Sequence, residues 1–424
     1  MERNKNIIII LFIALVQMAW SQNTAVVSDL TIQGNKKLKT SFITKIARVK
    51  AGAKLDSALI QNDIKRLKRL PSVSHASYQV FFSHDNAYNV FYNIEENFTI
   101  IPSVSVYTSN DGEFAYRLGL YEFNTLGRNI TFGGFYQEDV YSSYGINLRA
   151  PNLFSRSTGI SVNVQNLKTL EPVFLDTGTA SYSYQNTSYE LLGLHAFNFN
   201  NRMELGANLF RENYEYKSGA LDTKVPQAFS VDKHLFKFIY EYNNLNYDYQ
   251  YVDGFRSMFN GQYVGVNGSS DLPEFLIAWN DFLYYTKVGT KGNWANRLRI
   301  GFSSNINSPF APFSVDNNLN IRGAGNTIDR GTGAVVLNTE YRHTLIEKNW
   351  FVLQSNTFID AGSWRNPGGE LGDFGKAHNI RVNPGLGLRF MHKHIYNAIF
   401  RIDYGVGITK NDAKGFVFGI GQYF

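Results

Sequence analysis

The chain contains no cysteine among its 424 residues. This absence excludes structural disulfides, thiolate zinc sites and cysteine nucleophiles together. Beyond the first 21 residues the sequence also lacks a continuous apolar stretch of the roughly 20 residues that a membrane-spanning helix needs. Any membrane crossing must therefore be made by β-strands.

Recognisable catalytic motifs are missing as well. Gly323-Ala324-Gly325 is followed by Ile328 where a dinucleotide fingerprint requires glycine. Gly375-Lys376-Ala377 lacks both the hydroxyl residue and the spacing of a phosphate-binding loop. No serine, histidine and acidic grouping has a known local motif. We therefore expect no enzyme and no cofactor.

One short segment, His392-Lys393-His394, offers two potential metal ligands. It lies between two alternating segments, residues 381–391 and 395–406, which favours a basic turn between strands. We therefore expect no metal site.

The first 21 residues form a basic start followed by a short apolar core. Arg3 and Lys5 precede an apolar run of about 13 residues, and Ala19-Trp20-Ser21 has the small-x-small pattern of a cleavage site. Residues 1–21 are therefore predicted to be a secretory signal peptide. A retained signal anchor is the alternative.

The rest of the composition is aromatic and rich in glycine, with 26 Tyr, 33 Phe and 36 Gly. The mean hydropathy of -0.24 would suit a soluble protein. Strands of a membrane barrel alternate lipid-facing and lumen-facing residues, so their average hydropathy is low too.

Residues 22–97 follow a strand, helix, helix, strand, strand pattern. An alternating run at 27–32 ends at Gly34-Asn35, and residues 42–46 form a short helical face. Leucines and isoleucines then recur at helical spacing over 55–70, and two alternating runs follow at 76–82 and 87–95. This order predicts a small α+β domain.

The two predicted helices of this domain are strongly basic, with eleven Lys and Arg between Lys36 and Arg69 against Asp56 and Asp63. Contact with anionic lipid head groups or an acidic partner is one interpretation, and a solvated helix face is the other. The candidate basic face consists of Lys36, Lys37, Lys39, Lys65, Arg66, Lys68 and Arg69.

From residue 98 to residue 424 the sequence changes to alternating segments of about ten residues, separated by Asn/Asp/Gly-rich connections. This pattern predicts a transmembrane antiparallel β-barrel of about 16 strands. Dividing the sequence into segments gives about 17 strands, whereas an even number is required if the N-terminal domain and the C-terminus lie on the same side of the membrane. We therefore predict that one apparent break between strands is false, namely Asn186-Thr187-Ser188 inside a single strand from 178 to 199. A soluble β-sandwich is the alternative, and Tyr and Phe at the segment ends argue against it.

The final ten residues are predicted to be the last strand, paired with a first strand at 101–108 that contains Val104. Glycines at 415, 419 and 421 suit a seam that opens, and they suit a tapered closed barrel equally well. A last strand finishing in Phe is similar to the signal by which bacterial barrels are recognised for insertion. The residues predicted to share one face of this strand are Phe416, Phe418, Ile420 and Phe424.

Several segments resemble a known family. The runs IQGNKKLKTSFI, KAGAKLDSALIQNDIKRLKRL and NVFYNIEE resemble a POTRA domain, the periplasmic module of BamA-type proteins. A long connection from 303 to 332 contains Ile321-Arg322-Gly323-Ala324-Gly325, which resembles the V-R-G-F/Y motif of that family's lumenal loop. Ile and Ala here replace the Val and the aromatic residue of the motif.

A second resemblance lies in the strand that contains Phe358, whose FIDAG sequence is similar to the family's F-x-D-x-G motif. The resemblance implies that Asp360 pairs with Arg322, that Gly362 belongs to the same motif, and that Glu340 is a further inward-facing candidate. Arginine suits such a loop because its planar fork of donors can be held by a wall carboxylate. Ordinary lumenal polarity is the alternative interpretation.

Together these segments are similar to the BamA/TamA-type outer-membrane protein insertases and translocases, with one POTRA domain where family members usually carry more. The resemblance implies an outer-membrane location with the POTRA domain in the periplasm. The implied partners are the lipid bilayer, unfolded outer-membrane or secreted clients and accessory factors, with no nucleic acid. A dedicated two-partner-type secretion channel and a passive pore are the alternative functions.

Overall fold

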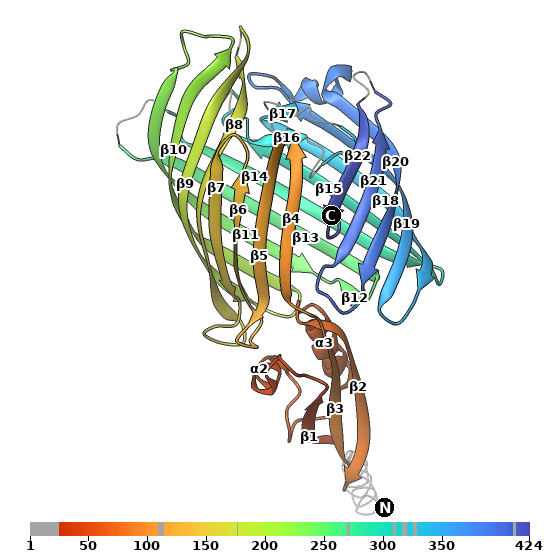
Figure 1. Ribbon diagram of the computed structural model, residues 1–424. Coiled ribbons are helices and arrows are strands. Elements are labelled where there is room, and N and C mark those ends of the chain that lie inside the picture. Colours follow the sequence, from red (N-terminus) through yellow and green to blue (C-terminus); the bar gives the residue numbers. More distant parts are fainter. Residues whose placement is uncertain are drawn as a thin grey trace, which may run out of the picture.

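The computed structural model describes residues 25–108, 114–175, 177–268, 272–307, 311–315, 320–324, 329–409 and 413–424. The predicted signal peptide and Gly325 lie outside the described residues. The chain folds into a small N-terminal α+β domain set against one end of a large β-barrel (Figure 1). No helix in the described ranges is long and apolar enough to cross a membrane.

The N-terminal domain has the predicted order of elements. They are β1 (Val26–Gln33), α2 (Thr40–Ile46), α3 (Ser57–Lys68), β2 (Val73–His84) and β3 (Ala87–Glu96). The sheet order is β1-β3-β2, with β1 parallel and β2 antiparallel to β3.

Helix α3 begins where the Asp56 side chain accepts hydrogen bonds from the amides of Ala58 and Leu59. Its apolar face is buried against the sheet, with Ile60 and Leu67 almost inaccessible to solvent. Burial of this face holds the helix on the sheet.

Sixteen long strands of the described residues form the barrel, which confirms the predicted fold class. They are β4 (Ile100–Thr108), β5 (Phe114–Thr125), β6 (Ile130–Glu138), β7 (Ser142–Ala150), β8 (Thr158–Leu175), β9 (Gly178–Ala196), β10 (Asn201–Gly219), β11 (Ala228–Asn243), β13 (Tyr251–Val266), β14 (Phe275–Val288), β15 (Gly292–Ser303), β18 (Gly333–Glu347), β19 (Phe351–Arg365), β20 (Ile380–His392), β21 (Ile399–Val406) and β22 (Lys414–Ile420). A short strand, β12 (Asn246–Asp248), pairs with β13 at the end next to the α+β domain.

Strands β8, β10 and β11 are much longer than the predicted ten residues, with 18, 19 and 16 residues, whereas β9, predicted as a single strand from 178 to 199, has 19. Strand β9 is continuous through residues 186–188, so the break predicted to be false is indeed absent. The extra length lies at the barrel end away from the α+β domain (Figure 1). There an apolar cluster that includes Val173, Tyr182 and Tyr214 stabilises the extended hairpins.

Side chains alternate between the outer and inner faces of the wall, as in a membrane barrel. On β9, Tyr189 and Leu191 point outward, with 60% and 58% of their surface exposed. The alternating residues Glu190 and Leu192 point inward and are buried. The outer face is therefore apolar and the inner face carries the charges.

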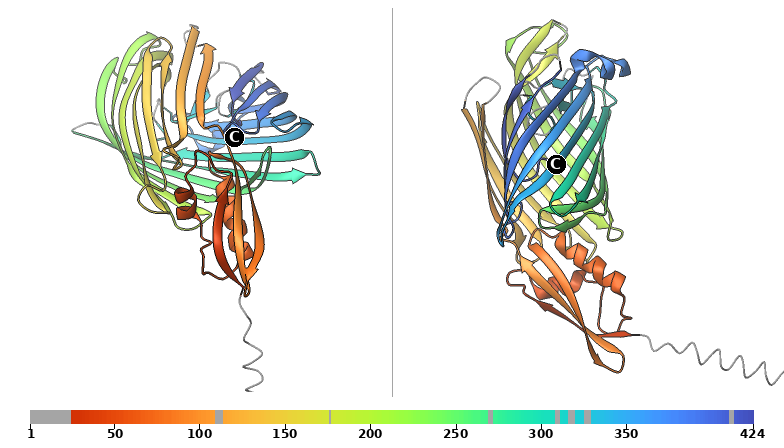
Figure 2. Two further views of the ribbon diagram at one scale, coloured as in Figure 1. Left: turned by 60° about the horizontal axis from the view of Figure 1, so that its bottom comes forward. Right: turned by 90° about the vertical axis from the view of Figure 1, so that its right-hand side faces the viewer.

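The barrel closes where β22 meets β4. Each of the other fifteen neighbouring pairs forms an antiparallel ladder with a residue-by-residue register. Strands β22 and β4 are hydrogen-bonded neighbours as well, and they are short, with seven and nine residues. The two strands differ in colour, orange for β4 and dark blue for β22, and the views of Figure 2 show the two edges facing each other. The seam therefore joins two of the shorter strands of the wall.

Candidate functional site

The long connection between β15 and β18 folds back against the inner face of the barrel. It contains two short paired strands, β16 (Phe313–Val315) and β17 (Asp329–Gly331). Val315 and Ile321 are completely buried and pack in one cluster with Trp364 of β19. The described residues 313–315 and 320–324 of this loop are therefore packed inside the lumen and do not form an exposed surface loop.

Arg322 lies at the centre of this packed loop and has no exposed side-chain surface. Its Nε and Nη2 atoms donate to the two oxygens of Asp360, at 2.8 and 2.9 Å. Its backbone amide donates to Oδ2 of the same carboxylate at 3.0 Å, and Nη1 donates to Glu340 at 2.7 Å. The pairing that the resemblance implied, with Asp360 first and Glu340 beside it, is present.

Aromatic rings cover the Arg322 guanidinium. Its Cζ atom lies 3.6 Å from the ring centroid of Phe358 and 4.5 Å from that of Tyr423. A guanidinium is weakly hydrated and stacks well on rings, so this site suits arginine and would not suit lysine.

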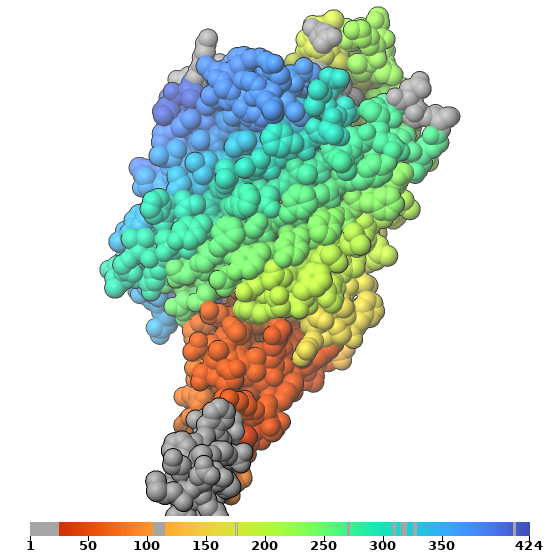
Figure 3. Space-filling model, turned by 180° about the vertical axis from the view of Figure 1, so that it is seen from behind, coloured from red at the N-terminus to blue at the C-terminus, as the bar shows by residue number. Residues whose placement is uncertain are grey.

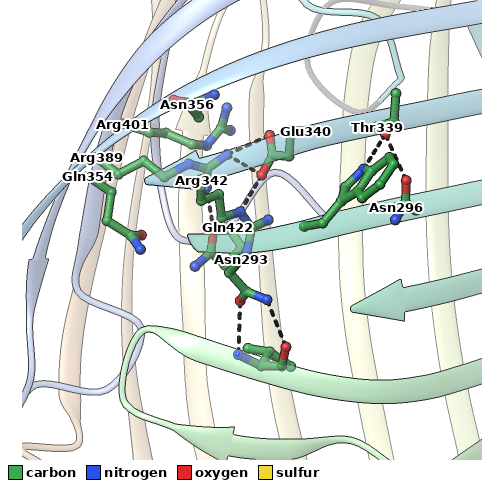
Figure 4. Close-up of polar contacts among 12 residues, drawn as sticks. Asn293, Asn296, Thr339, Glu340, Arg342, Gln354, Asn356, Arg389, Arg401 and Gln422 are labelled. Atoms are coloured by element: carbon green, nitrogen blue, oxygen red, sulfur yellow. Dashed lines mark hydrogen bonds and ion pairs between the residues drawn. The ribbon is translucent and has the colours of Figure 1, made fainter. Parts of the chain in front are cut away.

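Glu340 is shared among three arginines. Nη2 of Arg389 donates to its oxygens at 2.6 and 2.8 Å, and Nε of Arg342 donates to Oε1. Figure 4 shows the side chains of Arg342, on the same strand as Glu340, and Arg389, on β20, both reaching Glu340. A buried carboxylate is stable in this position because three guanidinium groups surround it.

The network continues to Asp403 on β21, which lies 3.6 Å from Nη1 of Arg322 and 3.3 Å from Nη1 of Arg401. The amide of Asn356 also donates to Asp403, at 3.0 Å. Among the described residues, four arginines thus face three carboxylates in one buried network.

Two glycines let the loop approach the wall closely. Gly323 has φ +84°, and a Cβ there would lie 2.5 Å from the carbonyl oxygen of Gly405. A Cβ on Gly362 would lie 2.8 Å from Cδ1 of Ile321. The Gly of the FIDAG segment is therefore required by packing against the loop. Ala324 is buried in the same cluster, where the family's motif has an aromatic residue.

The last four residues depart from the sequence prediction. Strand β22 ends at Ile420, and at Gly421, with φ +90°, the chain turns into the lumen. Tyr423 is 6% exposed and lies against Arg322, and Phe424 packs beside a buried cluster that includes Leu283. The prediction that Phe424 shares one face of the terminal strand with Phe416, Phe418 and Ile420 was therefore wrong, because the strand ends before the turn at Gly421.

The other predicted seam residues do lie on the outer face. The exposed fractions are 53% for Val104, 62% for Phe416, 70% for Phe418 and 41% for Ile420.

Several members of the lumenal network were not predicted from the sequence. They are Arg342, Asn356, Arg389, Arg401, Asp403, Gln422 and Tyr423. The period-two alternation along the strands could have predicted some of them. Arg342 stands two residues after Glu340, and Asp403 two residues after Arg401, so each pair shares the inner face of its strand. Pairing between distant strands could not be read from the sequence.

The basic face divides into two groups. Arg66 and Arg69 contact the barrel: Nε of Arg69 donates to the Leu245 carbonyl at 2.9 Å, and both guanidinium groups lie over the ring of Phe199. Burial at this contact lowers the pKa of Arg69 to about 10. The remaining members differ in exposure: Lys36, Lys37 and Lys39 are exposed, whereas Lys65 and Lys68 are half-buried.

The α+β domain abuts the barrel directly (Figure 3). Nζ of Lys45 donates to the Asn152 carbonyl at 2.8 Å. The linker amide of Phe98 donates at 2.8 Å to the carbonyl of His394, in the turn between β20 and β21. That turn is basic as predicted, although β21 begins at Ile399 and not at 395. The interface places the domain at one mouth of the barrel.

The lumenal face of β5 to β8 is open, in contrast to the network side. Phe135, Gly145 and Gln165 lie opposite one another on β6, β7 and β8. They border a cavity of about 260 Å³ that Arg117 and Asn147 also line. The Arg117 guanidinium lies 3.5 Å from the ring centroid of Phe135.

Comparisons with known proteins agree with this architecture. Residues 25–97 match the family model for POTRA, described as surface antigen variable number repeat. Among solved structures, BamA from Haemophilus ducreyi lacking POTRA domains 1-3 is 17% identical, with a TM-score of 0.55 over 94% of this chain and 84% of that chain.

Two CdiB structures are also similar. CdiB from Acinetobacter baumannii is 14% identical, with a TM-score of 0.61 over 94% of this chain and 74% of that chain. CdiB from Escherichia coli is 12% identical, with a TM-score of 0.60 over 95% of this chain and 75% of that chain.

The fold thus defines a β-barrel with an N-terminal POTRA domain. More narrowly, the chain has one POTRA domain followed by a barrel with the fold of BamA and CdiB, which confirms the resemblance drawn from the sequence.

Proposed function

We propose that this protein inserts unfolded outer-membrane proteins into the membrane, or translocates unfolded chains across it, in the manner of BamA. Its POTRA domain lies in the periplasm and receives extended client segments. The clients then engage the seam between β22 and β4. The work is mechanical, with no enzymatic step and no cofactor.

The observation that carries this proposal is the shortness of the two strands that meet at the seam. Strand β22 has seven residues and β4 has nine, whereas β8 to β11 have 16 to 19, and β22 turns out of the wall at Gly421. A short strand pair has few hydrogen bonds to exchange for those of an incoming strand, and an opened edge is a template for another strand. Pro102 in β4 has no amide hydrogen and is typical of such an edge.

The Arg322 network, which lies on the β22 side of the seam, also supports this proposal. It fixes the loop to β18, β19 and β21, so this half of the barrel keeps its shape when the seam is disturbed. The POTRA domain contacts turns of both halves, through Asn152 on one side and His394 on the other. A client bound at the POTRA domain is thus presented at the mouth of the barrel.

Photo-crosslinking in living cells tests the proposal. A photoreactive amino acid is placed at Val104 on β4 and at Phe418 on β22, both exposed at the seam. The matched control is Leu191 on β9, which is equally exposed but distant along the wall. We expect crosslinks to nascent outer-membrane proteins from the two seam positions and none from Leu191.

The alternatives give different results in companion assays. Loss of a single exported protein on depletion, with other barrels unaffected, would indicate a dedicated two-partner-type channel. Large steady conductance in planar bilayers with no assembly defect would indicate a passive pore. Crosslinks confined to the protein itself would reject a role of the seam in insertion.

A further inference from the structure

Residues 422–424 occupy a defined site in the lumen. Nη1 of Arg389 donates to Oε1 of Gln422, a contact drawn in Figure 4. Tyr423 lies between two guanidinium groups, with its ring centroid 4.5 Å from Cζ of Arg322 and 4.8 Å from Cζ of Arg401. Three consecutive side chains are thus held away from the strand that carries them.

Phe424 fills the apolar end of this site. It packs beside the buried cluster of Leu245, Val252, Leu283, Tyr285 and Ala295, which comes from β13, β14, β15 and the turn before β13. The site therefore spans the lumen, from β20 and β21 to the opposite strands β13 and β14. Its lining offers a polar end, a cationic middle and an apolar end.

A guanidinium with two nitrogen atoms that are unsatisfied within the described part of the chain lies beside the Phe424 position, and its Nε atom donates to Glu340. The guanidinium of Arg342 is fully buried, and its Nη1 and Nη2 atoms have no hydrogen-bond partner among the described residues. Its Cζ lies 5.8 Å from the ring centroids of both Phe424 and Tyr285. Buried N–H groups without partners are costly, so this position would gain from a carboxylate.

The segment that fills the site is attached by a single turn. Ile420 remains paired with Phe400, and the ladder of β21 and β22 ends there. Gly421 has φ +90°, which a glycine adopts without strain and can leave without strain. Residues 422–424 can thus move without breaking any ladder of the barrel.

We propose that this lumenal site is a binding site for an extended polypeptide segment with two adjacent aromatic side chains and a neighbouring carboxylate, and that residues 422–424 are its internal occupant. An incoming segment exchanges with them. The identity of the ligand as part of an unfolded client rests on the function proposed above, whereas the site itself does not. The aromatic pair takes the places of Tyr423 and Phe424, and the carboxylate pairs with Arg342.

Equilibrium binding to purified full-length protein in detergent tests the site. The probe is a fluorescent ten-residue peptide with the sequence of residues 415–424 and a free carboxylate. In one variant the site is emptied by Gln422→Ala, Tyr423→Ala and Phe424→Ala. We expect the peptide to bind the emptied variant at least tenfold more tightly than the unchanged protein, because the internal occupant no longer competes.

Three controls define specificity. A peptide with both terminal aromatic residues replaced by alanine, and the amidated peptide, should each bind the emptied variant several-fold more weakly. Adding Arg342→Gln to the emptied variant should remove the preference for the free carboxylate. Equal binding to the emptied and unchanged proteins, or binding indifferent to the aromatic residues, would overturn the proposal.

A second measurement covers the case in which the emptied variant does not fold, as judged by its mobility on unheated gels. A photoreactive amino acid at Leu283, which lines the Phe424 end, should crosslink the peptide saturably in the otherwise unchanged protein. No crosslink at saturating peptide would also overturn the site. Peptide binding together with failed insertion of clients would reject the proposed function alone, and insertion without peptide binding would reject the site alone.

Discussion

The two halves of the barrel that flank the seam are built differently on their inner faces. From β18 to β21 the lumen is filled, with Arg322, Asp360 and Glu340 fully buried and paired. From β5 to β8 it is open, and glycines face the lumen beside a cavity of about 260 Å³. One half is therefore fixed by a fully buried network, whereas the other is held by fewer and partly exposed contacts, such as those of Asn147 with Asn163 and of Arg149 with Glu204.

The difference bears on where the wall can yield. Buried charges in a network have one good arrangement, because any displacement leaves a charge unpaired. A glycine-rich wall without a packed interior has no comparable constraint. We infer that β4 to β8 move relative to the network side when the seam is engaged.

The largest expected effect comes from breaking the network. Arg322→Ala should destabilise the loop by about 3–5 kcal/mol, because Asp360 then stays buried without its main partner. The barrel should still insert, while the connection from 303 to 332 becomes sensitive to protease and activity falls. Limited proteolysis and denaturant unfolding measure this.

Arg211→Ala is the matched control for that change. Arg211 forms a bidentate pair with Asp232, at 2.7 Å for both contacts, but both side chains are about half exposed. Its loss should leave the unfolding midpoint almost unchanged, because solvent screens an exposed pair. Equal effects of the two substitutions would contradict the special position of the buried network.

A smaller effect is expected from overfilling the packed half. In Gly362→Ala the new Cβ would lie 2.8 Å from Cδ1 of Ile321, so the loop must shift, at a cost of about 1–3 kcal/mol. Gly415→Ala on β22 is the control, since nothing lies within 4 Å of its Cβ. Thermal unfolding of the refolded barrels compares them, and an unchanged midpoint for Gly362→Ala would refute the close packing.

Filling the open half should affect function more than stability. Gln165→Trp places a large ring in the cavity beside Phe135, and we expect about threefold fewer client crosslinks from Val104, equivalent to about 0.7 kcal/mol. Leu191→Trp, at an outward-facing position on β9 that does not line the cavity, should leave crosslinking unchanged. If both variants crosslink like the unchanged protein, the open half has no part in client passage.

The smallest expected effect concerns the POTRA domain, which contacts turns of both halves. Burial, and then nearby Lys68, lower the pKa of His75, whose ring stacks on Tyr249 of the barrel at 5.2 Å. Glu95 and Asp248 oppose this shift. Because the docked state binds protons less readily, its stability is full above the ordinary His pKa of about 6.5 and falls as the pH drops below that value.

Distances between spin labels on the POTRA domain and the barrel measure this dependence. They should broaden between about pH 7.5 and about pH 5.5 in the unchanged protein. His75→Gln should remove the change, since glutamine does not titrate. A pH response that survives this substitution would assign it to another group.

Much of the architecture could be predicted because it depends on local pattern. Alternation along the strands and the helical spacing over 55–70 are properties of neighbouring residues, so the element order and the barrel followed from them. The pairing of Arg322 with Asp360 came from a resemblance in two motifs. The lengths of β8, β10 and β11 were missed, whereas β9 was predicted as one long strand.

The rest depends on distant contacts. The roles of Arg389 and Asp403 arise only when β20 and β21 are brought beside β18 and the loop. The inward turn at Gly421 interrupts a pattern that otherwise continues to Phe424, and the reason lies in the arginines that receive Tyr423. Sequence alternation gives the face of a residue in a strand, but it does not say where the strand ends.

A disulfide lock across the seam tests directly whether clients engage the seam between β22 and β4. The natural absence of cysteine means that only introduced pairs can form. Val104→Cys is combined in turn with Phe416→Cys, Phe418→Cys or Ile420→Cys, all on the outer face. A pair across the ladder of β21 and β22, Ile402→Cys with Phe418→Cys, is the control. Insertion of a client barrel into liposomes should stop when the seam is oxidised and recover on reduction, while the control pair has no effect. Full insertion activity through an oxidised seam would contradict the account.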